Sequence, residues 1–342
     1  MDPRLSGVLA RRSPAVFTAS EAYTVGLDAG TIHRLCRRGE VIRLASGTYT
    51  SAEVWSTADP IERHLLLAAS RCAALEGRGD ISLALSHDSA AAWWGLPLLC
   101  TPKRGHLTLC GPGAARTRAE YTVHRRYGVD QCSTYRSVDT DSAEYPRLGH
   151  PRVQVRTVSP VLAAFGVAET RGFLAGVVAL DGALHSAKAQ PEDAVGWLSR
   201  LRRRPGMATI RSVVQAADAL AESPLETQAR VVLQSLGYRP RLQARLLSTD
   251  GHFVARVDLL IEDLGVVVEV DGRVKYQQHN STQALVSEKR RENAIVDLGY
   301  AVFRLEHHHL ADPKAIDACI QQAARRAHSP QRRSTRAPSV RL

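Results

Sequence analysis

The sequence lacks any apolar run close to the roughly 18 to 20 residues that a membrane-spanning helix needs. Its first stretch, MDPRLSGVLARRSP, also lacks the apolar core of a signal peptide. Its six cysteines, at positions 36, 72, 100, 110, 132 and 319, include no CxxC pair, which argues against a zinc site or a disulfide. We therefore expect a soluble cytoplasmic protein with reduced core thiols and no membrane partner.

Acidic residues are missing from positions 325–342, where six arginines carry +6 of the formal net charge of +11. Residues 1–50 add +3 through seven arginines and four acids. Basic charge at both ends of a chain is typical of a protein with a polyanionic partner, most often nucleic acid. A tail that only improves solubility would have the same composition. We predict that residues 329–342 form a disordered basic tail.

The length of 342 residues exceeds one ordinary core and predicts two or three domains. The patterns along the chain predict a mixed α/β (α+β) protein in three parts. These are a winged helix-turn-helix over 1–58, a mainly helical middle domain over 59–222, and a core of order α-β-β-β-α-β over 223–328.

Three short helical patterns open the chain, over roughly 4–11, Ser20 to Gly26 and Asp28 to Arg38, with Ser20 as a plausible cap. The stretch EVIRLASGTYTS then predicts two strands around Ser46-Gly47. Three helices and a hairpin form a winged helix-turn-helix, in which the third helix enters the major groove of double-stranded DNA. A generic small helical bundle is the alternative.

The third helix of this region has an apolar face formed by Ile32, Leu35 and Cys36. Basic side chains follow on its other face and in the hairpin, and these are the predicted DNA contacts: His33, Arg34, Arg37, Arg38 and Arg43.

The middle region carries no recognisable chemistry. His87 and Asp88 in LSHDSAAAWWGLP could form a functional pair, but a first helical turn capped by Ser86 explains them better. Strand-like segments follow in HLTLC and EYTVHRR, and Ser159-Pro160 begins a run of helices that reaches about Ala221.

The last region begins at Ser223-Pro224-Leu225-Glu226, a helix start with its cap, proline and glutamate. Three strands are predicted in RLQARLLS, FVARVDLLI and GVVVEV. A polar helix over about 285–298, the strand YAVFRLE and a helix from Pro313 complete the order.

Carboxylates meet on two of these strands. Glu269 and Asp271 are two residues apart and share a strand face, and Asp258 lies on the preceding antiparallel strand. Three carboxylates suit Mg²⁺ or Mn²⁺, which would activate water for phosphodiester hydrolysis. Lys275 or Lys289 could stabilise the transition-state charge. Alternatively, Asp258 and Asp271 are surface acids near turns.

This order, together with Glu226, Asp258, Glu269 and Asp271, resembles the PD-(D/E)XK nuclease superfamily, and within it the branch of very-short-patch-repair (Vsr) endonucleases. The resembling stretches are SPLETQARVVLQSLGY, RVDLLIEDLGVVVEVDG and EKRRENAIVDLGYAVFRL. The resemblance implies a restriction-endonuclease-like core with catalytic acids, and metal ligands at Asp258 and Glu269. The usual lysine two residues after the glutamate is Asp271 here, so Lys275 or Lys289 would have to replace it.

The first 220 residues resemble the AbiEi antitoxins of type IV toxin–antitoxin systems, through FTASEAYTVGLDAGTIHRLCRRGEVIRLASGTYT and LSHDSAAAWWGLP. That resemblance implies binding to DNA, usually at the protein's own promoter, and a nucleotidyltransferase-like toxin as partner. Two hypotheses follow: a DNA-binding metal-dependent endonuclease in defence or repair, or an autoregulating antitoxin with an inactive nuclease fold.

Overall fold

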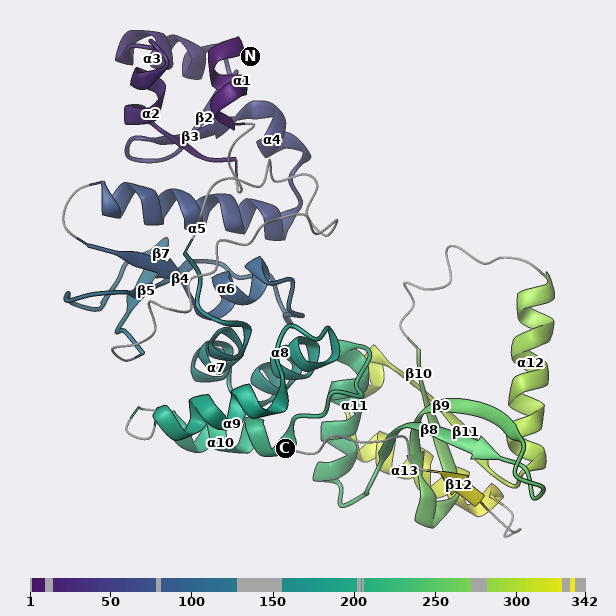
Figure 1. Cartoon of the computed structure of the whole chain (residues 1–342). Coiled ribbons are helices and arrows are strands. Elements are labelled where there is room, and N and C mark those ends of the chain that lie inside the picture. The colour runs from purple at the N-terminus through teal and green to yellow at the C-terminus, as the bar shows by residue number, and fades with distance from the viewer. Residues whose placement is uncertain are drawn as a thin grey trace. The chain divides into compact units, whose positions relative to one another are not determined.

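A computed structural model describes residues 2–9, 15–77, 81–127, 156–201, 204, 206–271, 282–327 and 333–335. The chain divides into two compact units, both visible in Figure 1. Unit 1 comprises residues 1–180 and 192–213, and unit 2 comprises 181–191 and 214–342. Both units combine helices with a sheet, which confirms the prediction of a mixed chain.

Unit 1 begins with three helices and a small sheet of order β1-β3-β2. The predicted hairpin is present, but β1 pairs with β3 and adds a third strand. Thr18 caps α2 in a capping box with Glu21, so the cap predicted at Ser20 is wrong. The elements are α1 (Pro3–Leu9), β1 (Phe17–Thr18), α2 (Ala19–Thr24), α3 (Ala29–Arg37), β2 (Val41–Ala45) and β3 (Thr48–Ser51).

The long helix α5 packs against this sheet, and Leu66 and Ala69 meet Leu44 in one core cluster. Asp59 caps α5 in a capping box with Glu62, and Pro60 occupies the first turn. The helices between residues 52 and 216 are α4 (Ala52–Thr57), α5 (Pro60–Glu76), α6 (His87–Trp93), α7 (Pro160–Arg171), α8 (Phe173–His185), α9 (Pro191–Arg200) and α10 (Met207–Ala216).

The rest of unit 1 is not only helical, because it holds a second sheet of order β4-β5-β7-β6. Its central pair, β5 and β7, is parallel, so the chain returns to the same end of the sheet between them. The strands are β4 (Leu83–Leu85), β5 (Gly105–Leu109), β6 (Arg116–Thr117) and β7 (Tyr121–His124).

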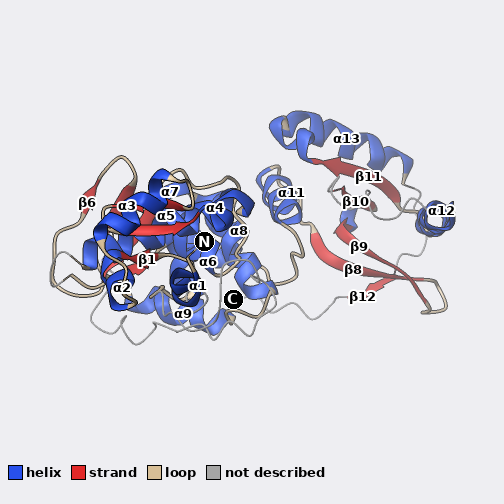
Figure 2. Ribbon diagram, turned by 90° about the horizontal axis from the view of Figure 1, so that it is seen from above, coloured by secondary structure: helices blue, strands red, loops and turns tan. Residues whose placement is uncertain are grey.

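Unit 2 is built on a sheet of order β11-β10-β9-β8-β12 with helices on both faces. Buried side chains of α11 and α13 share a core with one face of the sheet, whereas Ile295 of α12 packs with the other face. Figure 2 shows these three helices and the sheet as ribbons. β10 and β11 are parallel, and the other neighbours are antiparallel. The elements are α11 (Pro224–Ser235), β8 (Arg241–Leu247), β9 (Phe253–Ile261), β10 (Val266–Asp271), α12 (Thr282–Asp297), β11 (Ala301–Glu306), α13 (Pro313–Arg326) and β12 (Arg333–Thr335).

The basic tail differs from its prediction at one place. Arg333–Thr335 forms β12 and pairs with β8, because an edge strand offers free backbone hydrogen-bonding groups. The other residues of 329–342 lie outside the described part of the chain.

Neither a membrane-spanning helix nor a disulfide occurs among the described residues. No helix among them combines the length and apolar character that crossing a membrane requires. The five cysteines within the described ranges form no disulfide, but of these only Cys72 is buried and Cys100 is exposed.

Candidate functional site

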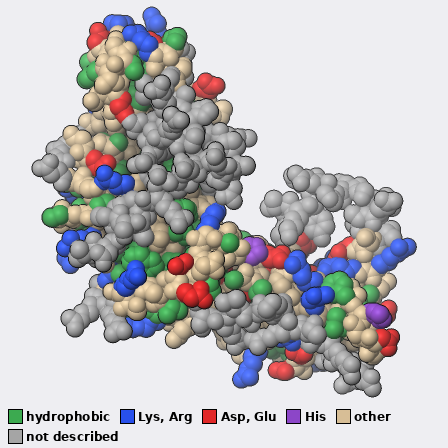
Figure 3. Space-filling view, in the orientation of Figure 1, with side chains coloured by type: hydrophobic (Ala, Val, Ile, Leu, Met, Phe, Trp, Pro, Cys, Tyr) green, Lys and Arg blue, Asp and Glu red, His purple; other side chains and the backbone are tan. Residues whose placement is uncertain are grey.

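The predicted recognition helix α3 separates its apolar and basic faces clearly. Asp28 caps it by accepting the Thr31 N–H at 2.6 Å, and Ile32 and Leu35 are buried in the core that the first helices share with β1 and β2. The five predicted DNA-contacting side chains, His33, Arg34, Arg37, Arg38 and Arg43, are all exposed. Lys and Arg side chains lie at this end of unit 1 in Figure 3.

Asp258 and Glu269, two of the predicted acids of unit 2, have partners within the protein itself. Asp258 on β9 accepts the N–H of Val270 at 2.8 Å through Oδ2. Glu269 on β10 has Oε1 3.3 Å from Nη2 of Arg291 on α12. Burial raises the pKa of Glu269 to about 7, the Arg291 charge opposes that rise, and the Asp258 charge adds to it.

Glu226 stands at the start of α11 and completes its cap. Its carboxylate accepts hydrogen bonds from the backbone of Glu222 at 3.0 Å, from Ser223 Oγ at 2.9 Å and from Gln243 Nε2 at 2.9 Å. Burial nevertheless raises the pKa of Glu226. The donors around this buried carboxylate are those that a structural acid requires.

The three predicted metal ligands do not come together at one point. Asp258, Glu269 and Asp271 do not form a group whose oxygens all lie within 4.8 Å of one another. Lys275 lies outside the described residues, and Lys289 is exposed on α12. Two residues on, Arg291 is the cation that reaches Glu269.

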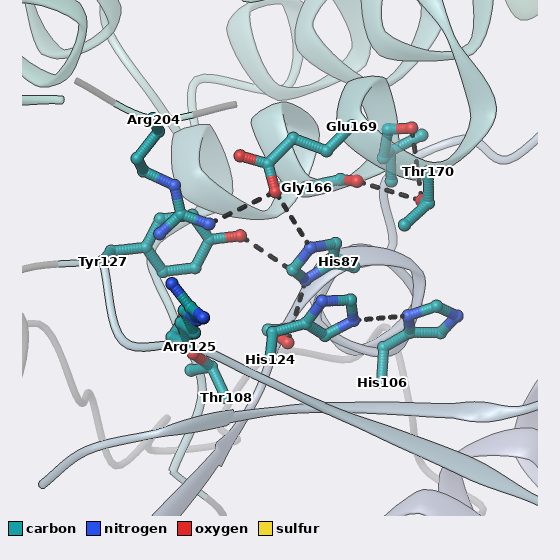
Figure 4. A network of polar contacts seen from close by, with 12 residues as sticks. His87, His106, Thr108, His124, Arg125, Tyr127, Gly166, Glu169, Thr170 and Arg204 are labelled. Carbon is teal, nitrogen blue, oxygen red and sulfur yellow. Dashed lines mark hydrogen bonds and ion pairs between the residues drawn. The ribbon is translucent and has the colours of Figure 1, made fainter. Parts of the chain in front are cut away.

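A different cluster, in unit 1, was missed from the sequence. His87 of α6, His106 of β5 and His124 of β7 offer ring nitrogens within 4.8 Å of one another, the only such group of three potential ligands in the described part of the chain. These residues form the histidine cluster (Figure 4). Nδ1 of His106 lies 3.0 Å from Nε2 of His124, and the rings of His87 and His124 stack 3.6 Å apart.

His87 and Asp88 do form the first turn of α6 after Ser86 at the cap position, but capping does not account for them. The Ser86 side chain makes no capping hydrogen bond, and His87 is fully buried with a φ of 50°. A left-handed backbone costs free energy in a non-glycine residue, so the surrounding contacts must hold it. Ser86 Oγ instead lies 3.0 Å from His87 Nδ1.

Carboxylates flank the histidine cluster and are themselves anchored. Asp88, 1% exposed, lies 3.6 Å from His106 and accepts Nε of Arg171 at 3.0 Å. Glu169 of α7 lies 3.3 Å from Nε2 of His87 and equally far from Nη2 of Arg204.

Burial disfavours the charged form of three histidine rings in this region. It lowers the pKa of His106 to about 4 and that of His124 to about 2. The pKa of His64, whose Nε2 lies 2.9 Å from Ser89 Oγ, falls to about 4 for the same reason. His106 and His124 therefore present neutral imidazoles at neutral pH, the state in which histidine coordinates metal ions.

A cavity of about 840 Å³ adjoins the histidine cluster. His124 and Glu169 contribute to its wall together with four arginines: Arg116, Arg125, Arg126 and Arg204. Such a lining favours anions and gives solutes a way to His124.

Comparison with known proteins bears on the first part of the chain. Residues 9–52 match the model of a family described as a transcriptional regulator, AbiEi antitoxin. No curated protein matches the chain. The crystal structure of the RV2827C protein from Mycobacterium tuberculosis is similar at 20% identity over 66% of this chain and 78% of that one, with a TM-score of 0.36. That likeness is too distant to carry an inference about fold or function.

Proposed function

We propose that this protein is a DNA-binding transcriptional regulator of the AbiEi antitoxin type, with α3 as its recognition helix. The observation that carries the proposal is the exposed basic face of α3, which lies inside the segment that matches the antitoxin family. The family match supports a regulator that binds DNA and, in general, a toxin as partner. A nucleotidyltransferase-like toxin is the specific partner that we propose.

The chemistry of α3 supports reading of a major groove. Ile32 and Leu35 fix the helix to its core, so its other face, with Arg34 and Arg37, points to solvent. The Arg34 Nη2 group donates to Thr31 Oγ1 at 2.7 Å, which restricts the side chain before DNA arrives. Arginine presents a planar pair of donors to guanine O6 and N7, and one such contact discriminates by about 1–3 kcal/mol.

The test is a gel-shift titration of the full chain against the DNA upstream of its own gene and a shuffled duplex. Arg34→Ala with Arg37→Ala should lower affinity for the upstream DNA by at least about tenfold, since each bidentate contact contributes roughly that factor. Binding to the shuffled duplex should change much less.

A charge-matched control separates a specific contact from lost positive charge. Arg200→Ala with Arg211→Ala removes two exposed arginines from α9 and α10 of the same unit. This control should retain the preference for the upstream DNA. Equal loss in both double variants would mean that only net charge acts and would overturn the assignment of α3.

We also propose, second to the regulator, that the acids of unit 2 support Mg²⁺- or Mn²⁺-dependent phosphodiester cleavage. The supporting observation is the carboxyl of Glu269, buried beside the charge of Asp258, because repelling carboxylates can be stabilised by a shared cation. Asp271, Glu226, and Lys275 or Lys289 would complete the site. The test is cleavage of single-stranded, double-stranded and mismatched DNA by the full chain and by Glu269→Gln. Uncut DNA with the wild type would leave the antitoxin proposal alone.

A further inference from the structure

The histidine cluster has carboxylates on its outer side. His106 turns Nδ1 toward His124 and Nε2 toward Asp88, at 3.0 and 3.6 Å. His87 turns Nε2 toward Glu169 at 3.3 Å. Histidines that bind metal ions almost always give their second ring nitrogen to a carboxylate, a carbonyl or water, which fixes the ring and its tautomer. Figure 4 shows this arrangement for His87 and Glu169.

The outer carboxylates cannot turn freely, because each is held by an arginine. Arg171 Nε donates to Asp88 Oδ1, and Thr170 Oγ1 donates to Asp88 Oδ2 at 3.3 Å. Arg204 holds Glu169 at 3.3 Å and stacks over the ring of Tyr127 at 4.1 Å. The orientation of the rings is therefore set by two layers of contacts.

We propose that His87, His106 and His124 bind one divalent transition-metal ion, with Zn²⁺ as the expected occupant. Imidazole nitrogens suit zinc, copper, nickel or iron, whereas Mg²⁺ prefers oxygen. In a tetrahedral site with Zn–N bonds near 2.0–2.1 Å, neighbouring nitrogens lie about 3.3 Å apart. The separation of 3.0 Å between His106 Nδ1 and His124 Nε2 is close to that value, and this contact is now a hydrogen bond between the two rings. The rings of His87 and His124 stack with their centroids 3.6 Å apart. Binding of the ion therefore releases the proton of that hydrogen bond and requires a ring to turn so that the three lone pairs converge.

The ligating nitrogens would be Nδ1 of His106, Nε2 of His124 and Nδ1 of His87. The last of these now lies 3.0 Å from Ser86 Oγ and 3.4 Å from the Tyr127 hydroxyl, both of which can rotate to serve as acceptors or donors elsewhere. His64 does not belong to the set, because its Nε2 contacts Ser89 and its ring is not in the group of three.

Three protein ligands leave one position for an exogenous ligand. His124 reaches the arginine-lined cavity, so water or an anion can enter from there. This assignment does not depend on the DNA-binding proposal, since none of these residues lies on α3.

A second group of histidines, at the surface, can also bind metal ions, and its binding must be distinguished from that of the buried cluster. His307, His308 and His309 are consecutive in unit 2, and His308 is 65% exposed, so this run can bind metal ions by itself. The experiment therefore uses the full chain without an affinity tag, stripped with a chelator and titrated with Co²⁺ and Zn²⁺. Visible absorption reports four-coordinate Co²⁺, and a chromophoric competitor gives the Zn²⁺ affinity.

The variants are His87→Gln, His106→Gln and His124→Gln, compared with two controls. One control is His64→Gln, buried but outside the cluster, and the other replaces His307, His308 and His309 together by Gln. Each cluster variant should weaken the tight site at least about 10- to 100-fold, the loss that removal of even an outer-shell partner causes. Both controls should retain one tight site with the Co²⁺ spectrum of the wild type.

Three results would overturn the proposal: no tight site in the wild type, loss of the site only in the 307–309 variant, or equal loss in His64→Gln. Should a cluster variant not fold, by circular dichroism, the wild type with Co²⁺ decides through proton NMR. Three hyperfine-shifted ring N–H signals are expected, one from each ligand, and fewer than three would contradict the set.

Discussion

Unit 2 distributes its buried carboxylates among separate partners, whereas unit 1 places histidine rings at the centre of a cluster and carboxylates at its margin. In unit 2, Asp181 pairs with Arg230 at 2.7 Å, and Glu269 meets Arg291. In unit 1, Asp88 and Glu169 stand outside the histidines and are held by arginines.

The difference matters for what each region can bind. A buried carboxylate that already has an internal partner must exchange that partner for a new ligand, and the exchange costs desolvation of both charges. A neutral imidazole has no charge to desolvate, and it offers a lone pair to a cation once its hydrogen bond is released. The histidine cluster is thus better prepared to accept a cation than the acids of β9 and β10.

The largest predicted effect on stability comes from substituting Gly166 in α7, which packs against the histidine cluster. A methyl group there would come within 2.6 Å of Cγ and 2.8 Å of Cα of His87, so backbone as well as ring must shift. Gly166→Ala should destabilise unit 1 by about 1–3 kcal/mol through overpacking. Thermal or denaturant unfolding followed by circular dichroism measures the change.

The matched control for that variant is Gly196→Ala in α9, where a methyl group meets nothing within 4 Å. This substitution should stabilise the helix by about 0.5–1 kcal/mol, because alanine has the higher helix propensity. Equal stability of the two variants would show that the histidine cluster is loosely packed.

The next prediction concerns how the stability of unit 2 depends on pH. The pKa of Glu269 is raised from 4.5 to about 7 in the folded protein, mainly by burial. Between those pH values the folded state holds a proton that the unfolded state has released, so this residue makes stability fall as pH rises. Glu269→Gln should remove that fall and stabilise the protein above pH 7 by about 1–3 kcal/mol.

Unfolding free energies measured from pH 4 to pH 8 test this expectation. Glu288→Gln is the control, since that carboxylate is 43% exposed and contacts the same arginine. Its effect should stay within about 0.5 kcal/mol across the range, as for other exposed ion pairs. An unchanged pH profile in Glu269→Gln would mean that the carboxyl is already ionised.

The smallest predicted effect distinguishes the roles of two basic residues of α12, Arg291 and Lys289. Arg291→Ala removes the charge beside Glu269 and should move its titration to higher pH, with a loss of about 0.5–1 kcal/mol at neutral pH. Lys289→Ala should leave the profile unchanged, because two residues on a helix are about 200° apart and Lys289 is exposed. If the titration of Glu269 shifts in both variants, Lys289 also acts on the acids of unit 2. The same pH series provides the measurement.

Local chemistry explains which features were predictable. The starts of α5 and α11 follow from a cap, a proline and a glutamate within four residues, and the structure has both. The cap of α2 was misplaced because Thr18 and Ser20 are both suitable, and only the pairing of β1 with β3 decides between them.

The histidine cluster could not be predicted because its parts come from one helix and two strands. His106 and His124 lie on strands that the sequence indicates, yet their meeting depends on the parallel pairing of β5 and β7. His87 adds a backbone conformation that no residue preference suggests. One signal was available in the sequence: His87 and Asp88 stand next to each other at the start of the otherwise mainly apolar helix α6.

The short strand β12 has a consequence for self-association. Arg333–Thr335 covers backbone groups of β8 from Arg245 to Leu247 that would otherwise form an open sheet edge. Open edges recruit strands from other molecules, and proteins prevent this by covering them or by placing positive charge along them. The segment Arg333–Thr335 belongs to the basic C-terminal stretch, and it covers the sheet edge at which strands of neighbouring copies could otherwise pair.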